Sequence, residues 1–163
     1  HALQFLKTPP VSLWSDLKKV AAAGDSEDHL KIVMRNAAGL VVDLEISGGS
    51  ALDEPEYLIS GTRGALRASG KTITLRYWDP KVKPAPRKAS PDAPRAGFGS
   101  KDDLRWIEQE IPVAPKLAKC EMPMVWDYLF ETVRKGKAFP ITLDQAVAVM
   151  EVISAVKKGT RFA

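Results

Sequence analysis

Apolar and polar residues alternate along much of the first two thirds of the chain. Within residues 40–47 every even-numbered position is apolar, while the odd-numbered positions are mainly polar. A period of two residues is typical of a strand that buries one face. Residues 30–34 alternate in the same way, and the Asn-Ala-Ala-Gly run at 36–39 has the composition of a turn. The pattern therefore predicts a β-hairpin over residues 30–47.

Other short runs on either side of this hairpin also have strand composition. Two glycines, Gly61 and Gly64, bracket a polar pair and predict a tight turn between two of these runs. Gly70 predicts a second turn a few residues further on. The strands predicted in addition to the hairpin cover 11–17, 56–60, 65–69, 72–78 and 104–111.

The last third of the chain changes to a period of three to four residues. Apolar side chains recur with this spacing from Met122 to Val133, which predicts an amphipathic helix. Pro123 is tolerated in the first turn of such a helix, and Gly136 is placed to end it.

A second helix is predicted after Pro140. Thr142 is the expected N-cap, and Gln145 three residues later completes a capping box. Lys157 and Lys158 lie in the expected last turn, where cations suit the helix dipole, and Gly159 is expected to close the helix.

Strands followed by helices are typical of the α+β class. The predicted architecture is an open-faced, predominantly antiparallel β-sheet with helices packed on one face. A chain of 163 residues has the size of one domain, so a single domain is expected over 1–163. Residues 80–101 contain five prolines and show no periodicity, which predicts a long loop with a functional role or without structure of its own.

The net charge of +4 comes from this same loop. Six of the 24 Lys and Arg residues, and one of the 20 Asp and Glu residues, lie in 80–101, so the rest of the chain is close to neutral. A nucleic-acid protein normally carries its positive charge on a folded face, so nucleic acid is not an expected partner. No apolar run approaches the roughly 18 residues of a membrane span and no signal peptide is visible, so a cytoplasmic location is expected.

Few residues of the chain are suited to metal or nucleophilic chemistry. Cys120 is the single cysteine, and the two histidines are His1 and His29, which argues against an internal disulfide and a zinc site. The acidic run 25–29 is interpreted as a solvated turn in which Asp and Ser bind local backbone groups. No catalytic residue, metal ligand or cofactor-binding residue is assigned in this chain.

Two tryptophans fall on the polar side of their predicted strands. Trp14 and Trp78 share that side with Val33 and Val41. Large apolar side chains on a polar face are typical of a protein interface, so these four residues are the candidate interface.

Two motifs follow one another along the chain. Residues 61–66 read Gly-Thr-Arg-Gly-Ala-Leu after a predicted strand, and residues 136–146 read Gly-Lys-Ala-Phe-Pro-Ile-Thr-Leu-Asp-Gln-Ala at the start of the last helix. Together they resemble the C-terminal domain of the Gfo/Idh/MocA oxidoreductases, whose patterns are G-T-x-G-x-L and G-K-P-x-P-[VI]-T-x-[ED]-x-A. Within 136–140, Ala138 is the one departure. The resemblance runs from about Ala2 to Gly159.

This resemblance implies that the chain is the substrate-side and oligomerisation domain of an NAD(P)-dependent oxidoreductase acting on a sugar or polyol. A separate N-terminal Rossmann domain would bind NAD or NADP, so the chain alone is expected to bind neither cofactor and not to catalyse. The bare face of the family's sheet commonly pairs with another subunit, which implies a homo-oligomer such as a dimer. His1 is not assigned as the catalytic histidine.

In the same picture, the segment 47–56 is a candidate substrate-facing loop. Gly48 and Gly49 give it conformational freedom, and Ser50, Asp53 and Glu54 are the candidate hydrogen-bonding residues for a polyol. An ordinary surface connection is an equally open interpretation of this segment.

Two other functions remain open at this point. The first is a non-enzymatic interaction module whose polar sheet face and basic loop 80–101 bind an acidic partner. The second, which the residues support less, is an RNA-binding sheet.

Overall fold

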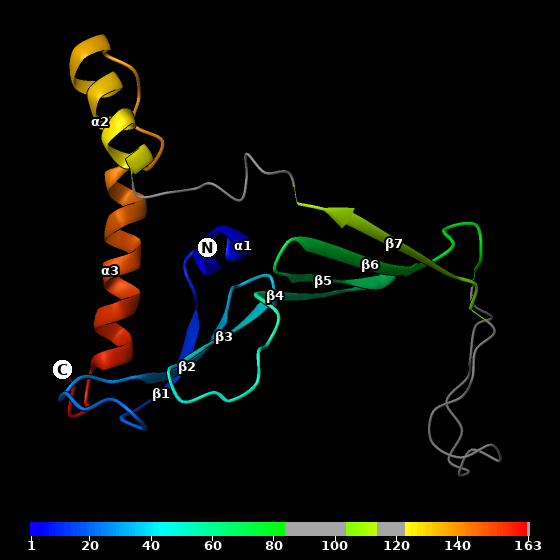
Figure 1. The fold of residues 1–163 in the computed structure, drawn as a ribbon, viewed down its shortest axis with the longest axis horizontal. Helices are drawn as coiled ribbons and strands as arrows, with labels where there is room; N and C mark the ends of the chain where they lie inside the picture. Colours follow the sequence, from blue (N-terminus) through cyan, green and yellow to red (C-terminus); the bar gives the residue numbers. More distant parts are fainter. Residues whose placement is uncertain (84–103, 114–122, 163) are drawn as a thin grey trace. The chain divides into compact units, whose positions relative to one another are not determined.

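The computed structural model describes residues 1–83, 104–113 and 123–162, which form two compact units. Of these, residues 1–52 and 123–162 belong to the first unit, and residues 53–83 and 104–113 belong to the second. The elements of both units are labelled in Figure 1. Each unit is described here by itself.

A three-stranded antiparallel sheet forms the centre of the first unit. Its strands are β1 (Ser12–Lys18), β2 (His29–Arg35) and β3 (Val41–Ser47), paired in the order β1-β2-β3. The predicted hairpin is therefore confirmed, and it is formed by β2 and β3. Gly39 closes its turn at φ +86°, a backbone conformation that glycine adopts without strain.

One face of this sheet carries the core of the unit. In register, the face holds three rows of side chains, each with one residue from each strand: Leu13, Met34 and Val42, then Ser15, Ile32 and Leu44, then Leu17, Leu30 and Ile46. Two helices contribute to the core from outside the sheet, α1 (Ala2–Leu6) with Leu6 and α3 (Leu143–Lys157) with Val156.

The helix α3 begins as the sequence predicts. The Thr142 hydroxyl accepts a hydrogen bond from the Gln145 backbone N–H, and the Gln145 side chain accepts one from the Thr142 N–H, which confirms the capping box. Its end confirms the prediction for Gly159, which directly follows the C-cap residue Lys158 and closes the helix at φ +78°. Lys158 itself lies just beyond the last turn. The Ser15 hydroxyl donates to the Val156 carbonyl oxygen (3.2 Å) and joins this end of the helix to β1.

The other helix of the first unit, α2 (Pro123–Lys135), also has the predicted position. Gly136 follows it at φ +66°, and its N–H donates to the Thr132 carbonyl oxygen (3.1 Å). A glycine in the left-handed region is a common helix end, because it has no Cβ to collide with the preceding turn.

The second unit is a four-stranded antiparallel sheet in the order β4-β5-β6-β7 (Figure 1). Its strands are β4 (Tyr57–Gly61), β5 (Gly64–Ser69), β6 (Thr72–Trp78) and β7 (Trp106–Pro112). Every predicted strand of the chain is observed, with bounds that differ by at most two residues.

The fold class is confirmed, because the strands pair antiparallel and the elements are those of an α+β protein. The strands form two sheets, however, and the alternation pattern had indicated one. The change of sheet follows Ser47, where Gly48 and Gly49 begin the connection to β4. Two glycines in sequence weaken strand pairing, since they cost more backbone entropy and offer no side chain to pack.

Candidate functional site

The predicted substrate-facing segment 47–56 begins at one end of the three-stranded sheet. There the Gly48 N–H donates to the Asp28 carbonyl oxygen (2.7 Å), and the Gly49 N–H donates to the Ser47 hydroxyl (3.2 Å). The Ser50 hydroxyl is exposed and donates to the Leu52 carbonyl oxygen (2.8 Å). A hydroxyl held this way keeps its oxygen lone pairs available as acceptors.

The other two candidate substrate residues are also exposed. Asp53 and Glu54 belong to the second unit, whereas Ser50 belongs to the first. Substrate binding by these three residues therefore stays a prediction.

The acidic run beside this segment is a turn organised by Asp28. One carboxylate oxygen of Asp28 accepts the backbone N–H of Val20 (2.5 Å), and the other accepts those of Ala21 (2.6 Å) and Ala22 (2.5 Å). These donors stabilise the ionised carboxylate and lower the pKa of Asp28 below its usual value. The interpretation that an aspartate of this run binds local backbone groups is confirmed, although sequence spacing did not single out Asp28.

Glu27, the residue before it, ties the same turn to the end of α3. Lys157 Nζ lies 3.0 Å from Glu27 Oε1. Local backbone hydrogen bonding and this lysine lower the pKa of the Glu27 carboxyl. Within the ranges that the structure describes, no three His, Cys, Asp or Glu side chains gather as metal ligands.

The polar face of the three-stranded sheet holds three of the four candidate interface residues. Trp14 and Val33 lie directly opposite each other on β1 and β2, and Val41 lies opposite Arg35 on the neighbouring pair. Trp14 keeps 57% of its surface exposed, which is unusual for a tryptophan. The fourth candidate, Trp78, lies on the other sheet, in the second unit.

Charged side chains surround these apolar residues on the same face. Lys31 Nζ lies 3.0 Å from a carboxylate oxygen of Asp43 and 2.8 Å from one of Glu45. The two carboxylates raise the pKa of Lys31, and Lys31 in turn lowers the pKa of Glu45. In register, the face carries three acids, Asp16, Asp43 and Glu45, and four bases, Lys18, His29, Lys31 and Arg35.

Trp78 has a partner that the sequence did not indicate. It pairs in register with Trp106 of β7, and their ring centroids are 6.4 Å apart. The Arg76 guanidinium lies 5.0 Å from the centroid of the Trp106 ring and pairs with Glu108 (3.1 Å). The alternation of β6 could have shown that Arg76 and Trp78 share a face, but the strand that pairs with them could not be read from the pattern.

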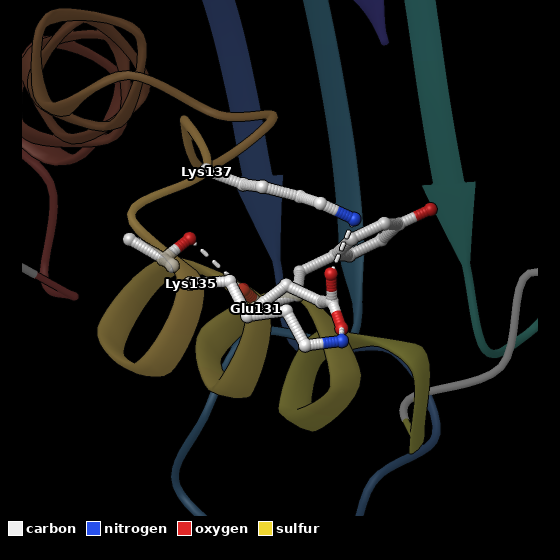
Figure 2. A network of polar contacts seen from close by, with 5 residues as sticks. Glu131, Lys135 and Lys137 are labelled. Carbon is white, nitrogen blue, oxygen red and sulfur yellow. Dashed lines mark hydrogen bonds and ion pairs between the residues drawn. The ribbon is translucent and has the colours of Figure 1, made fainter.

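A third polar cluster fixes the segment after α2. Figure 2 shows Lys135 and Lys137 directed to the same carboxylate, that of Glu131. Both lysines lower the pKa of Glu131, and Tyr128 contacts Phe139 edge to face with ring centroids 6.4 Å apart. Lys137 and Phe139 belong to the motif at 136–146, so the structure gives that motif a role in shaping the link between the two helices.

Some predictions fall on residues outside the described ranges. These are Cys120, Met122 and the part of the basic loop from 84 to 101. Among the helices that the structure describes, none has the length and apolar character needed to cross a membrane.

Comparison with solved structures finds the same fold in larger proteins. An oxidoreductase from Bacillus cereus superposes with a TM-score of 0.64 at 13% identity, over 95% of this chain and 45% of its own. The yvaA protein of Bacillus subtilis gives a TM-score of 0.67 at 12% identity, over 98% of this chain and 45% of its own. An NAD-binding protein from Listeria innocua gives 0.59 at 12% identity, over 91% of this chain and 42% of its own.

The likeness in fold predicted from the two motifs is therefore confirmed. The matched region is the C-terminal part of the oxidoreductases, and this chain spans less than half the length of each of the three proteins. No protein-family model matches the sequence, and a search of curated proteins finds no match either. At such low identity the superpositions define the fold, and the activity has to be argued separately.

Proposed function

We propose that this chain is the C-terminal substrate-side and oligomerisation domain of an NAD(P)-dependent oxidoreductase of the Gfo/Idh/MocA family that acts on a sugar or polyol. The two compact units would then be parts of one functional domain spanning 1–163. The observation that carries the proposal is the fold match, which covers 98% of this chain and 45% of a solved chain. The motifs at 61–66 and 136–146, each in its expected element, support the same family.

The nicotinamide cofactor is assigned to a Rossmann domain that precedes this one in the full-length protein. A dinucleotide site needs parallel strands with a glycine-rich turn into a helix. In the described ranges all strand pairs are antiparallel, and Gly61 and Gly64 lie between β4 and β5. These residues do not fit a dinucleotide, so the proposed role of the chain is to contact the substrate and other subunits.

Two measurements test this assignment. Isothermal titration of the 163-residue chain with NAD and with NADP should show no tight binding, and tight binding of either would contradict the proposal. The full-length protein should reduce NAD or NADP with at least one member of a panel of sugars and polyols. A reading frame without a glycine-rich strand-turn-helix motif in the preceding domain, roughly 100 to 200 residues long, would also argue against it.

The proposed homo-oligomer uses the polar sheet face with Trp14, Val33 and Val41, together with Trp78. This is supported by the exposed Trp14 and by the presence of both acids and bases on the face, since a face of mixed charge can be complementary to a copy of itself. Sedimentation of the protein should give a dimer or a larger assembly that Trp14→Asp weakens. A monomer at high micromolar concentration would contradict this.

The same charges give little support to an acidic partner. Lys31 is paired with Asp43 and Glu45, and Lys18 Nζ lies 2.5 Å from Asp16. A cation that already has a carboxylate partner gains little from a second acidic group. Both lysines of this face are therefore already paired, which weakens the interaction-module alternative.

A further inference from the structure

Asp28 joins two loops at one end of the three-stranded sheet. Its carboxylate accepts three backbone N–H groups from the loop that follows β1, as described above. Its backbone carbonyl oxygen accepts the N–H of Gly48, where the candidate substrate loop begins. Its own N–H donates to the Lys18 carbonyl oxygen at the end of β1 (3.1 Å).

The loop after β1 also limits the space beside Gly49. A Cβ placed on Gly49 would lie 3.1 Å from Cγ1 of Val20, which is closer than ordinary van der Waals contact. Val20 is itself one of the three residues that Asp28 holds. Val20 therefore restricts the space available to residue 49, and the Asp28 carboxylate holds Val20 in place.

A third contact fixes the cluster to the helix α3. Glu27 pairs with Lys157, and the neighbouring Val156 is part of the core. The loop after β1 is thus anchored at two consecutive residues, Glu27 and Asp28. The segment 47–52 is hydrogen-bonded to this loop through the Gly48 N–H.

We propose that Asp28 is a positioning residue for the substrate loop: it holds residues 47–52, and with them Ser50, in the conformation that meets the substrate. This inference rests on the proposed function, in which the segment 47–56 faces the substrate. Both carboxylate oxygens of Asp28 are occupied by backbone donors, so Asp28 acts through the loop and does not contact the substrate.

The physical reason lies in the composition of the loop. Gly48 and Gly49 leave its first residues more backbone freedom than other residues would, and ordering that freedom costs free energy at substrate binding. A loop held in place before binding avoids this cost. Hydrogen bonds to an ionised acceptor are stronger than those between neutral groups, which suits a carboxylate for the task.

The first experiment measures hydrogen exchange by mass spectrometry on the full-length protein. Asp28→Ala should speed exchange about tenfold or more in the peptides covering 19–28 and 47–52, while the β2 peptide 29–35 stays protected. Asp25→Ala is the matched control, because Asp25 lies in the same acidic run and makes no hydrogen bond or ion pair with the described residues. Asp25→Ala should leave the exchange rates of the peptides 19–28 and 47–52 unchanged.

The proposal is overturned if Asp28→Ala speeds exchange in 19–28 but leaves 47–52 unchanged. Should Asp28→Ala fail to fold, as shown by lost protection of 29–35, Asp28→Asn carries the same test. An amide keeps one acceptor oxygen, so Asp28→Asn should give a smaller change in both peptides. If Asp28→Asn speeds exchange in 19–28 and leaves the exchange rate of 47–52 unchanged, the proposal is overturned as well.

The second experiment separates positioning from general stability. With the sugar or polyol that the panel identifies, Asp28→Ala should raise KM about tenfold and change kcat less than about threefold, because the lost interaction aids binding in the ground state and the transition state alike. Asp28→Asn should raise KM by less than Asp28→Ala does. A fall in kcat with unchanged KM would contradict the proposal.

The two proposals can fail separately. If no sugar or polyol is oxidised, the proposed function fails, and the exchange experiment still decides whether Asp28 controls the segment 47–52. If a substrate is found and KM does not respond to Asp28→Ala, the positioning role fails and the proposed function stands.

Discussion

The two sheets of this protein have the same antiparallel pairing, but they differ in how they bury apolar residues. The three-stranded sheet buries Ile32 and Met34 together with Leu6 of α1 and Val156 of α3, and Met34 is only 1% exposed. In the four-stranded sheet no residue of the described ranges 53–83 and 104–113 is buried. The sheet with more strands is the one with the weaker core.

The comparison shows that strand pairing and core formation are separate matters. Cross-strand hydrogen bonds define both sheets, yet the net stabilisation by a hydrogen bond is small, because it replaces one made to water. Burial of apolar area contributes about 25 cal/mol per Å² and needs a second layer over the sheet. We therefore expect substitutions to affect the two sheets very differently.

The largest difference is expected for truncation of one apolar residue in each sheet. Met34→Ala should lower the free energy of unfolding by about 2 to 5 kcal/mol, because it leaves a cavity in a packed core. Leu75→Ala, at a half-buried position of β6, should cost less than about 2 kcal/mol. Urea denaturation of the two variants measures this. Equal losses would break the comparison and show that the second sheet has a covered face in solution.

The four-stranded sheet should tolerate most substitutions, but a glycine at one of its turns should be an exception. A Cβ on Gly64 would lie 2.5 Å from Cβ of Tyr77 and closer still to the Arg76 carbonyl oxygen. Gly64→Ala should therefore separate β5 from β6 and cost about 1 to 3 kcal/mol or more.

The matched control for that variant is Gly61→Ala, at the other end of the same turn. The nearest atom to its added Cβ is the Gly64 carbonyl oxygen, at an ordinary 3.5 Å. Urea denaturation should show a small effect for Gly61→Ala, and similar losses at both glycines would refute the steric explanation.

A smaller effect is expected when the start of α3 is changed. Thr142→Ala removes the hydroxyl of the capping box and should cost about 1 kcal/mol. Since α3 contributes Val156 to the first core, hydrogen exchange should increase in the first unit and stay unchanged in the second. Thr142→Ser, which keeps the hydroxyl, is the control. Equal destabilisation by both variants would mean that the cap is not the cause.

The smallest effect concerns pH and the turn at Glu27 and Asp28. Both carboxyls have pKa values below their usual 4.5 and 3.8, so the folded state favours the ionised forms. Their contribution to stability is complete above these usual values and is lost as the pH falls through the lower folded values. The first unit should lose stability below about pH 4, and the Asp28→Asn variant should show a flatter pH dependence in acid denaturation. An unchanged profile would contradict this.

Much of the fold could be predicted from local patterns. The alternation in 40–47, the turn closed by Gly39 and the capping box of Thr142 and Gln145 all depend on residues a few positions apart, and all three are observed. The helix end at Gly159 is also observed, because a left-handed glycine directly after the C-cap residue depends only on neighbouring positions.

The candidate site was less predictable. The segment 47–56 and its polar residues could be proposed from composition and from family resemblance, but the role of Asp28 could not. Its donors lie six to eight residues away, at a spacing that no helix or strand period marks. The pairing of Trp78 with Trp106 across two strands could not be predicted from the alternation pattern either. The residues between these strands do not specify a register.

The sequence by itself determined which residues form the strands and the two long helices α2 and α3, where the turns fall and that the chain belongs to the α+β class. These features follow from backbone preferences and from the period of the apolar positions, which are local properties. The tertiary structure decided how the strands divide between two sheets, which of the sheets acquires a core, and which residue joins the two loops. Those outcomes depend on contacts between residues far apart in the chain, and such contacts exist only once the packing energy of the whole unit has overcome the entropy of bringing the segments together.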